Sequence, residues 1–143
     1  MITNSISLNY KEYLKMIDVV CGIVKIRDKI LITQRSWEMK LPLKWEFPGG
    51  KLECNESEID CIKRELKEEL NIEIKVLKRL TNSEYNYGSF QINLIPYLVE
   101  YVSGEIILVE HKAFQLLGKD NLVNLDWAEA DLPIVRELIN MEI

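Results

Sequence analysis

The sequence has 143 residues, of which 48% are hydrophobic and 29% are charged, as expected for one globular domain. Its formal net charge of −5 argues against binding to a nucleic-acid polymer, because phosphate contacts require clustered Lys and Arg side chains. The three cysteines form no CxxC pair, and neither a signal-peptide segment nor a membrane-spanning apolar run is found, so we expect a cytoplasmic protein without a membrane partner.

The first part of the chain predicts an arm followed by a β-hairpin. Residues 1–15 are polar and mixed, and we expect an N-terminal arm on a single domain that spans residues 1–143. Residues 17–26 are rich in Val and Ile and predict a buried strand, and a turn at 27–29 leads into a second strand at 30–34. A loop at 36–44 then leads to the next motif.

A glycine loop and a helix follow. Gly49 and Gly50 come after Pro48, so the backbone can bend tightly there and approach a ligand closely. Ser57 is a candidate N-cap for the helix. Four apolar residues recur at helical spacing and predict its buried face: Ile59, Ile62, Leu66 and Leu70.

The same helix carries a cluster of acids on another face. Glu65, Glu68 and Glu69 are three and four residues apart, so their carboxylates crowd together and repel one another. By itself this pattern fits a solvated surface helix. Together with the glycine loop and Glu56 upstream, it favours a site for a hard divalent cation such as Mg²⁺ or Mn²⁺.

The rest of the chain predicts strands and a final helix. We expect strands at 72–80, 91–101, 105–110 and 113–117, a turn-rich stretch at 82–87, and Pro96 at a sheet edge or bulge. A last helix at 132–141 has Asp131 as candidate N-cap and Pro133 in its first turn. Strands on both sides of one central helix indicate an α/β (α+β) fold, with a mixed sheet packed between helices.

Residues 50–72 resemble the Nudix box, whose pattern is G-x5-E-x7-R-E-U-x-E-E-x-G-U, where U is a bulky aliphatic residue. The matching residues are Gly50, Glu56, Arg64, Glu65, Leu66, Glu68, Glu69 and Ile72. Asn71 departs from the pattern, since the family has glycine there. Because Asn tolerates the left-handed conformation, we interpret it as a helix stop that leaves the metal site intact. The resemblance implies a Nudix-type α/β/α sandwich with a mixed β-sheet.

The resemblance also implies hydrolysis of a nucleoside diphosphate linked to another group, with Mg²⁺ or Mn²⁺ as cofactor. The implied metal-binding residues are Gly49, Glu65, Glu68, Glu69 and Glu110, and the implied catalytic residues are Glu56, Arg64, Glu65 and Glu68. Glu56 and Arg64 match positions that hold the loop onto the helix, and a glutamate inside or outside the box serves as general base. For Glu110, a solvated strand end is the competing interpretation.

Arg35 and the lead-in from Trp45 to Lys51 resemble the MutT-like and CTP pyrophosphohydrolase-like branch of the family. The substrate-binding residues implied by this resemblance are Arg35, Phe47, Gly50, Lys51 and Asp131. Two alternatives stay open. Phe47 may be read equally as a core residue, and Asp131 as a plain N-cap. Trp45 is assigned to the core, and His111 to the surface or to a hydrogen bond.

The implied activity is that of a MutT-like nucleoside triphosphate pyrophosphohydrolase, which converts (d)NTP to (d)NMP and pyrophosphate. Oxidised dGTP, CTP and dCTP are the favoured substrates, and the protein would act on these small molecules as a monomer or homodimer. The alternatives are a Nudix hydrolase for another nucleoside-diphosphate-linked substrate, or a catalytically weak nucleotide-binding or regulatory domain. Three mutually repelling carboxylates argue against the latter, since a simple binder would not need them.

Overall fold

Eight strands and two α-helices make up residues 16–143, the part of the chain that the computed structural model describes. The predicted arm, residues 1–15, lies outside the described residues. The strands are β1 Met16–Ile26, β2 Lys29–Gln34, β3 Trp45–Glu46, β4 Gly49–Lys51, β5 Glu73–Arg79, β6 Ser83–Asn86, β7 Gln91–Ser103 and β8 Ala113–Leu117. The helices are α2 Glu58–Leu70 and α3 Leu132–Ile139, with 3-10 turns η1 Lys119–Asn124 and η2 Glu129–Asp131.

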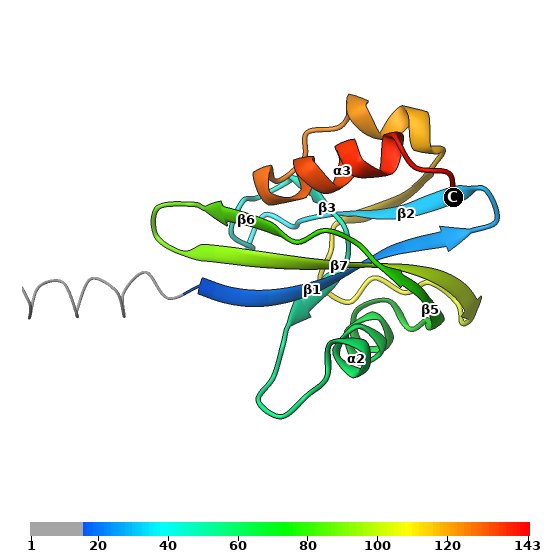
Figure 1. Ribbon diagram of the computed structural model, residues 1–143, viewed down its shortest axis with the longest axis horizontal. Helices are drawn as coiled ribbons and strands as arrows, with labels where there is room; N and C mark the ends of the chain where they lie inside the picture. Colours follow the sequence, from blue (N-terminus) through cyan, green and yellow to red (C-terminus); the bar gives the residue numbers. More distant parts are fainter. Residues whose placement is uncertain (1–15) are drawn as a thin grey trace, which may run out of the picture.

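The strands form one mixed sheet in the order β3-β2-β1-β7-β5, with β4 also paired to β1, β6 to β7 and β8 to β2. β1 and β7 run parallel, and the other strand pairs are antiparallel. Helix α2 lies on one side of the sheet and α3 on the other (Figure 1). This arrangement confirms the predicted α/β/α sandwich with a mixed sheet.

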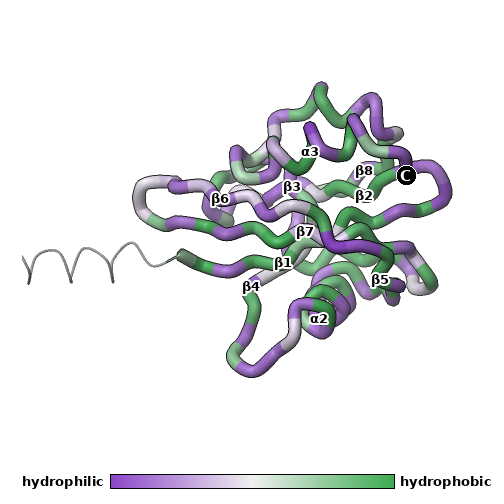
Figure 2. The backbone as a smooth tube through the Cα atoms, viewed as in Figure 1, coloured by the Kyte–Doolittle hydropathy of each residue, from purple (hydrophilic) through white to green (hydrophobic). Residues whose placement is uncertain are grey.

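The core divides into two layers because side chains alternate along the central strands. In β1, Cys21 and Ile23 pack on the α3 side, whereas Val20 and Val24 pack on the α2 side. Figure 2 shows the resulting hydrophobic stretches along the central strands of the sheet. Trp45 belongs to the α3-side core, as predicted.

Helix α2 begins and ends where its sequence predicts. The Ser57 side chain accepts a hydrogen bond from the Asp60 N–H, and Asn71 ends the helix at φ 61° and ψ 32°, the left-handed conformation. Ile62 is fully buried against the sheet, but Ile59 is 42% exposed, so its assignment to the buried face was wrong. Helical spacing predicts which side of a helix is buried, but it does not predict how far along the helix the buried contact extends.

Strand β7 is an interior strand, which corrects two predictions. Residues 83–86, expected as a turn-rich stretch, form β6 and pair with the first half of β7. Pro96 is therefore not at an edge; it lies between Leu94, which pairs with β6, and Tyr97, which pairs with β5. The alternative of a bulge fits this place, because β7 advances three positions from Leu94 to Tyr97 while its partner chain covers four from Arg79 to Ser83. The Pro96 carbonyl accepts a hydrogen bond from the Leu80 N–H. The proline nitrogen, which has no hydrogen to donate, faces the place where the partner of β7 changes from β6 to β5.

The segment between β7 and β8 is not the strand that we expected at 105–110. It runs along the C-terminal end of α2, where the N–H groups of Ile107 and Val109 donate to the carbonyls of Leu70 and Glu69 at 3.0 and 3.3 Å. These helix carbonyls have no partner within the helix, so they attract the passing chain. Glu110 accordingly lies in a loop beside α2 and does not end a strand.

Helix α3 was predicted in the right place, and Asp131 holds its N-cap position, but without the capping hydrogen bond that we expected. Pro133 occupies the first turn, and Ile134, Val135 and Leu138 are buried, as expected. The Asp131 side chain makes no capping hydrogen bond, because η2 continues directly into α3 and the carboxyl group turns into the site described below. Within residues 16–143, no helix combines the length and apolarity that crossing a membrane requires.

Candidate active site

Arg64 holds together three acids of the predicted motif. Its Nε lies 2.6 Å from Glu56 Oε2, and its Nη1 lies 2.9 Å from Glu65 Oε1 and 3.2 Å from Glu68 Oε2. The hydrogen bond with Arg64 lowers the pKa of Glu56 to about 2. The loop before α2 is thus joined to the helix by an ion pair, and Arg64 offsets part of the carboxylate repulsion.

The two glycines of β4 leave no space for a side chain. A Cβ atom on Gly49 would lie 2.0 Å from the Val20 carbonyl oxygen, and one on Gly50 would lie 2.2 Å from Glu65 Cδ. Strand β4 can therefore fit against β1 only with glycine at position 49, whereas a side chain at position 50 would displace the Glu65 carboxylate. The glycine loop and the acidic helix thus form a single packed unit.

Glu69 is the carboxylate without a counter-charge. Its Oε2 atom is buried and has no hydrogen-bond partner within residues 16–143. Burial, followed by the charges of Glu65, Glu46 and Glu110, raises the pKa of Glu69 to about 9. An unpaired buried carboxylate is costly, so this oxygen fits the requirement of a cation for oxygen ligands.

Two of the other predicted metal ligands are exposed to solvent. The side chain of Glu68 is 60% exposed, and Glu110 is exposed in its loop. Within the described residues, no three side chains of His, Cys, Asp or Glu are grouped closely enough to hold a metal ion together. Glu65 and Glu68 instead bind to Arg64, which supplies the positive charge between them.

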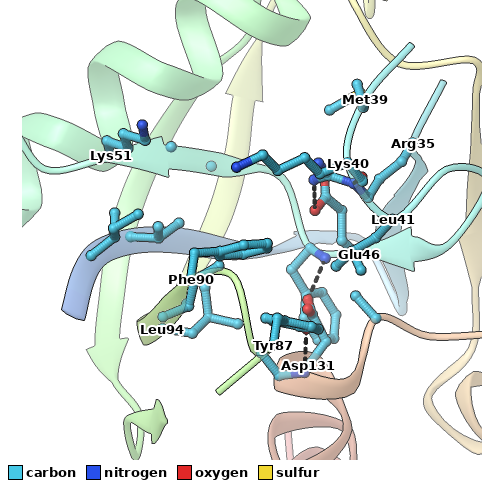
Figure 3. A pocket seen from close by; sticks show the side chains of 18 of the residues that line it. Arg35, Met39, Lys40, Leu41, Glu46, Lys51, Tyr87, Phe90, Leu94 and Asp131 are labelled. Atoms are coloured by element: carbon cyan, nitrogen blue, oxygen red, sulfur yellow. Dashed lines mark hydrogen bonds and ion pairs between the residues drawn. The ribbon is translucent and has the colours of Figure 1, made fainter. Parts of the chain in front are cut away.

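A pocket of about 290 Å³ adjoins this acidic end. Six of the predicted site residues line it, together with Glu69, and several further residues complete the wall (Figure 3). The predicted lining residues are Arg35, Phe47, Gly49, Gly50, Lys51 and Asp131. The other predicted site residues do not line the pocket: Glu56, Arg64, Glu65, Glu68 and Glu110. The pocket is thus charged at the β4 end and largely apolar near α3.

Asp131 lies on the wall of the apolar end. Its side chain is buried, and Oδ2 accepts a hydrogen bond of 2.9 Å from the Phe47 N–H. Burial raises the pKa of Asp131 well above its usual value, and the nearby charge of Glu46 raises it further. A carboxyl group that retains its proton can donate one hydrogen bond as well as accept others. Phe47 is both core and wall, since it is buried and also lines the pocket.

Arg35 and His111 both bind Glu46, which also lines the pocket. Arg35 Nη1 lies 2.7 Å from Glu46 Oε1, and His111 Nε2 lies 2.9 Å from Glu46 Oε2. His111 is therefore hydrogen-bonded, as one of our two interpretations held, but it is buried and not on the surface.

Sequence reasoning missed the aromatic residues of the β6–β7 hairpin. Tyr87 and Phe90 line the pocket with their rings stacked at 5.0 Å between centroids. Across the mouth, the Lys40 ammonium lies 4.5 Å from the Phe90 ring centroid (Figure 3). The signal in the sequence was the density of aromatic residues in 85–90, which begins within the stretch 82–87 that we predicted as turn-rich because it is polar.

The fold and the site together define a Nudix-type domain: a mixed sheet between two helices, with a glycine strand packed on an acidic helix. Residues 16–138 match the NUDIX domain family, and the chain belongs to this family.

Among its relatives, the chain is 33% identical over 122 residues to the CTP pyrophosphohydrolase of Escherichia coli K12, covering 85% of this chain and 90% of the relative. It is 29% identical over 126 residues to the 8-oxo-dGTP diphosphatase of the same organism, covering 87% and 98%. The solution structure of a MutT protein of the Nudix hydrolase family from methicillin-resistant Staphylococcus aureus 252 is 39% identical, with a TM-score of 0.72 over 88% of this chain and 97% of that one.

Proposed function

We propose that this chain is a MutT-like nucleoside triphosphate pyrophosphohydrolase, which hydrolyses (d)NTP to (d)NMP and pyrophosphate with Mg²⁺ or Mn²⁺. Oxidised dGTP, CTP and dCTP are the leading substrates, in keeping with the names of the two Escherichia coli relatives. The proposal includes one domain over residues 1–143, acting as a monomer or homodimer in the cytoplasm.

One observation carries this proposal: a single pocket joins an acidic end to an aromatic end. Glu69, Gly49 and Lys51 line one end, while Tyr87 and Phe90 line the other. A nucleotide has the same polarity, because a flat base is joined to a charged polyphosphate. The aromatic walls suit the base, and the acidic end suits a polyphosphate whose charge is neutralised by a cation.

The residues proposed to hold the cation are Gly49, Glu65, Glu68, Glu69 and Glu110. A divalent cation bound there would offset the charge of the polyphosphate and polarise the phosphorus that water attacks. Arg64 and Glu56 keep the glycine loop on the helix through their 2.6 Å contact, so their part in catalysis is to position the glutamates. A glutamate of this group takes the proton of the attacking water as general base, and the P–O bond between the α- and β-phosphates breaks.

At the other end, we propose that Arg35, Phe47 and Asp131 read the base. Phe47 supplies an apolar wall, and Arg35 is held at the pocket edge by Glu46. The Asp131 carboxyl, which already accepts from the Phe47 N–H, offers its remaining hydrogen-bonding capacity to the base edge. Gly50 and Lys51 contact the phosphates, since the Gly50 backbone and the Lys51 side chain line the charged end of the pocket.

The test is an assay of pyrophosphate release on a panel of CTP, dCTP, dGTP and oxidised dGTP, with Mg²⁺ and with excess EDTA. We expect metal-dependent release from at least one of these nucleotides and none in EDTA. Full activity in EDTA would overturn the metal assignment. Tight nucleotide binding without any release would support the alternative of a catalytically weak nucleotide-binding domain.

A further inference from the structure

Three side chains from separate parts of the chain form a hydrogen-bonded row that starts at the buried His111 and ends at the pocket wall, which Glu46 and Arg35 line. His111, which precedes β8, binds one carboxylate oxygen of Glu46 in β3 at 2.9 Å, and Arg35, which follows β2, binds the other at 2.7 Å. His111 is the most buried member, with 1% of its side chain exposed. Because a carboxylate only accepts, the Nε2–H of His111 is the donor.

The row continues into the loop of residues 36–44. Arg35 Nε donates to the Lys40 carbonyl, and the Arg35 N–H donates to the Lys44 carbonyl at 2.9 Å. Met39, Lys40 and Leu41 of this loop line the pocket. The loop thus forms one wall of the pocket mouth, where Lys40 meets Phe90 of the opposite hairpin (Figure 3).

This loop has a backbone that requires external support. Leu41 and Leu43 adopt positive φ angles of 52° and 64°, a region that is unfavourable for leucine. Contacts outside the loop must therefore hold this conformation. The Arg35 guanidinium supplies such a contact, and its direction is fixed by Glu46.

We propose that His111 is a positioning residue for the pocket mouth, acting through Glu46 and Arg35 on the loop of residues 36–44. Its Nδ1 atom is buried without a hydrogen-bond partner among the described residues, so Glu46 is the one polar contact that offsets the burial of this ring. With His111 in place, both Glu46 oxygens are fixed and Arg35 faces Lys40. Without it, Glu46 can rotate, and Arg35 loses its orientation.

The first test measures the loop itself and does not depend on the proposed function. Hydrogen–deuterium exchange is compared for wild type, His111→Leu, which removes the donor, and His111→Gln, whose amide N–H can reach Glu46. We expect exchange of residues 36–44 to be about three- to tenfold faster in His111→Leu, with β7 unchanged, and to be largely restored in His111→Gln.

Tyr97→Phe is the matched control, since it also removes one hydrogen bond to a glutamate, the 2.8 Å contact with Glu58, but away from the pocket. It should leave the exchange of residues 36–44 as in wild type. If His111→Leu does not fold, His111→Asn, whose shorter amide does not reach Glu46, takes its place with the same expected result.

The second test rests on the proposed function and uses the nucleotide that wild type hydrolyses best. We expect KM to rise about three- to tenfold in His111→Leu, with kcat changed by less than about twofold, because the loop shapes binding and not the acidic end. Any of four results would overturn the inference. Hydrogen exchange of the loop is unchanged in His111→Leu, or it rises equally in β7. The loss of activity is confined to kcat, or His111→Gln is as impaired as His111→Leu. A wild type that hydrolyses no nucleotide would refute the proposed function, whereas the exchange result would still decide the role of His111.

Discussion

The two ends of the pocket differ in the partners that they give to a buried carboxyl group. At the α2 end, Arg64 binds Glu56, Glu65 and Glu68, and Glu69 is left with a buried oxygen that no donor among residues 16–143 reaches. At the α3 end, Asp131 is also buried, but it accepts from the Phe47 N–H, and its raised pKa favours the neutral form. One end thus leaves a carboxylate oxygen free for a cation, as proposed above, whereas at the other end the carboxyl group has a partner within the chain.

This difference indicates which part of a substrate each end of the pocket can bind. An acidic cluster with too few counter-charges attracts a cation together with the anionic part of a substrate. A neutral buried carboxyl on an aromatic wall instead offers directional hydrogen bonds to an uncharged group. Damage at the first end should therefore affect every nucleotide alike, and damage at the second should affect one base more than another.

The largest effect is expected from Glu69→Gln. The amide keeps the shape but cannot replace a carboxylate as cation ligand, so hydrolysis of every nucleotide in the panel should fall by at least about 100-fold. The free energy of unfolding should be unchanged or higher, because a buried unpaired carboxylate is removed. The exposed residue Glu84 provides a matched control, and Glu84→Gln should keep wild-type activity. Near-normal turnover of Glu69→Gln would show that the acidic end does not depend on this residue.

Asp131→Ala should have a smaller and selective effect. If Asp131 binds the base, kcat/KM for the preferred nucleotide should fall by roughly 1–3 kcal/mol, the cost of leaving a polar group of the base unpaired. Nucleotides that do not use this contact should lose much less. The comparison uses CTP, dCTP, dGTP and oxidised dGTP with wild type and variant. An equal fall on all four would mean that Asp131 only supports Phe47, and that the base is read elsewhere.

Stability as a function of pH separates the two ends in another way. Burial raises the folded-state pKa of Asp131 above its unfolded value, so above about pH 4 the folded state binds a proton that the unfolded state has lost. This contribution therefore lowers stability as the pH rises from there toward the folded-state pKa. Asp131→Asn keeps an acceptor for the Phe47 N–H but does not titrate, so its stability relative to wild type should increase from pH 4.5 to pH 8.

Urea unfolding of the two proteins at both pH values measures this difference. Asn140→Ser is the control, because Asn140 lies at the exposed end of α3 and the substitution adds no titratable group. An Asp131→Asn stability difference that is equal at both pH values would show that Asp131 is ionised in the folded protein.

The smallest effect is expected from Asn71→Gly, at the end of the acidic helix. The φ angle of 61° at Asn71 suits glycine at least as well, and the substitution removes two exposed hydrogen bonds, from Asn71 Nδ2 to the Glu105 carbonyl at 3.2 Å and from Lys67 Nζ to Asn71 Oδ1 at 3.4 Å. The free energy of unfolding should change by less than about 1 kcal/mol, and turnover should stay nearly unchanged. A large loss of turnover would make Asn71 part of the acidic end.

Local spacing was sufficient to predict the acidic end. The Ser57 cap, the left-handed Asn71 and the grouping of Glu65 with Glu68 on one face all follow from interactions within one or two helical turns. Such short-range interactions can be predicted from the sequence, because the interacting residues are only three to four positions apart. The same holds for β1, β2, β8 and the buried face of α3, whose periodicity matches the structure.

Tertiary structure alone decided the aromatic end. The contact between Asp131 and Phe47 spans 84 residues, and the contact between His111 and Glu46 spans 65. In the sequence, Asp131 looks like a helix cap and residues 83–86 look like a turn, because local propensity cannot register a partner so far along the chain. The surroundings then set the chemistry, since the hydrogen bond with Arg64 lowers the pKa of the Glu56 carboxyl group, whereas burial raises the pKa of the Asp131 carboxyl group. The sequence determined which acids share a helix face, and only the packing of distant segments decided which acid is left without a partner.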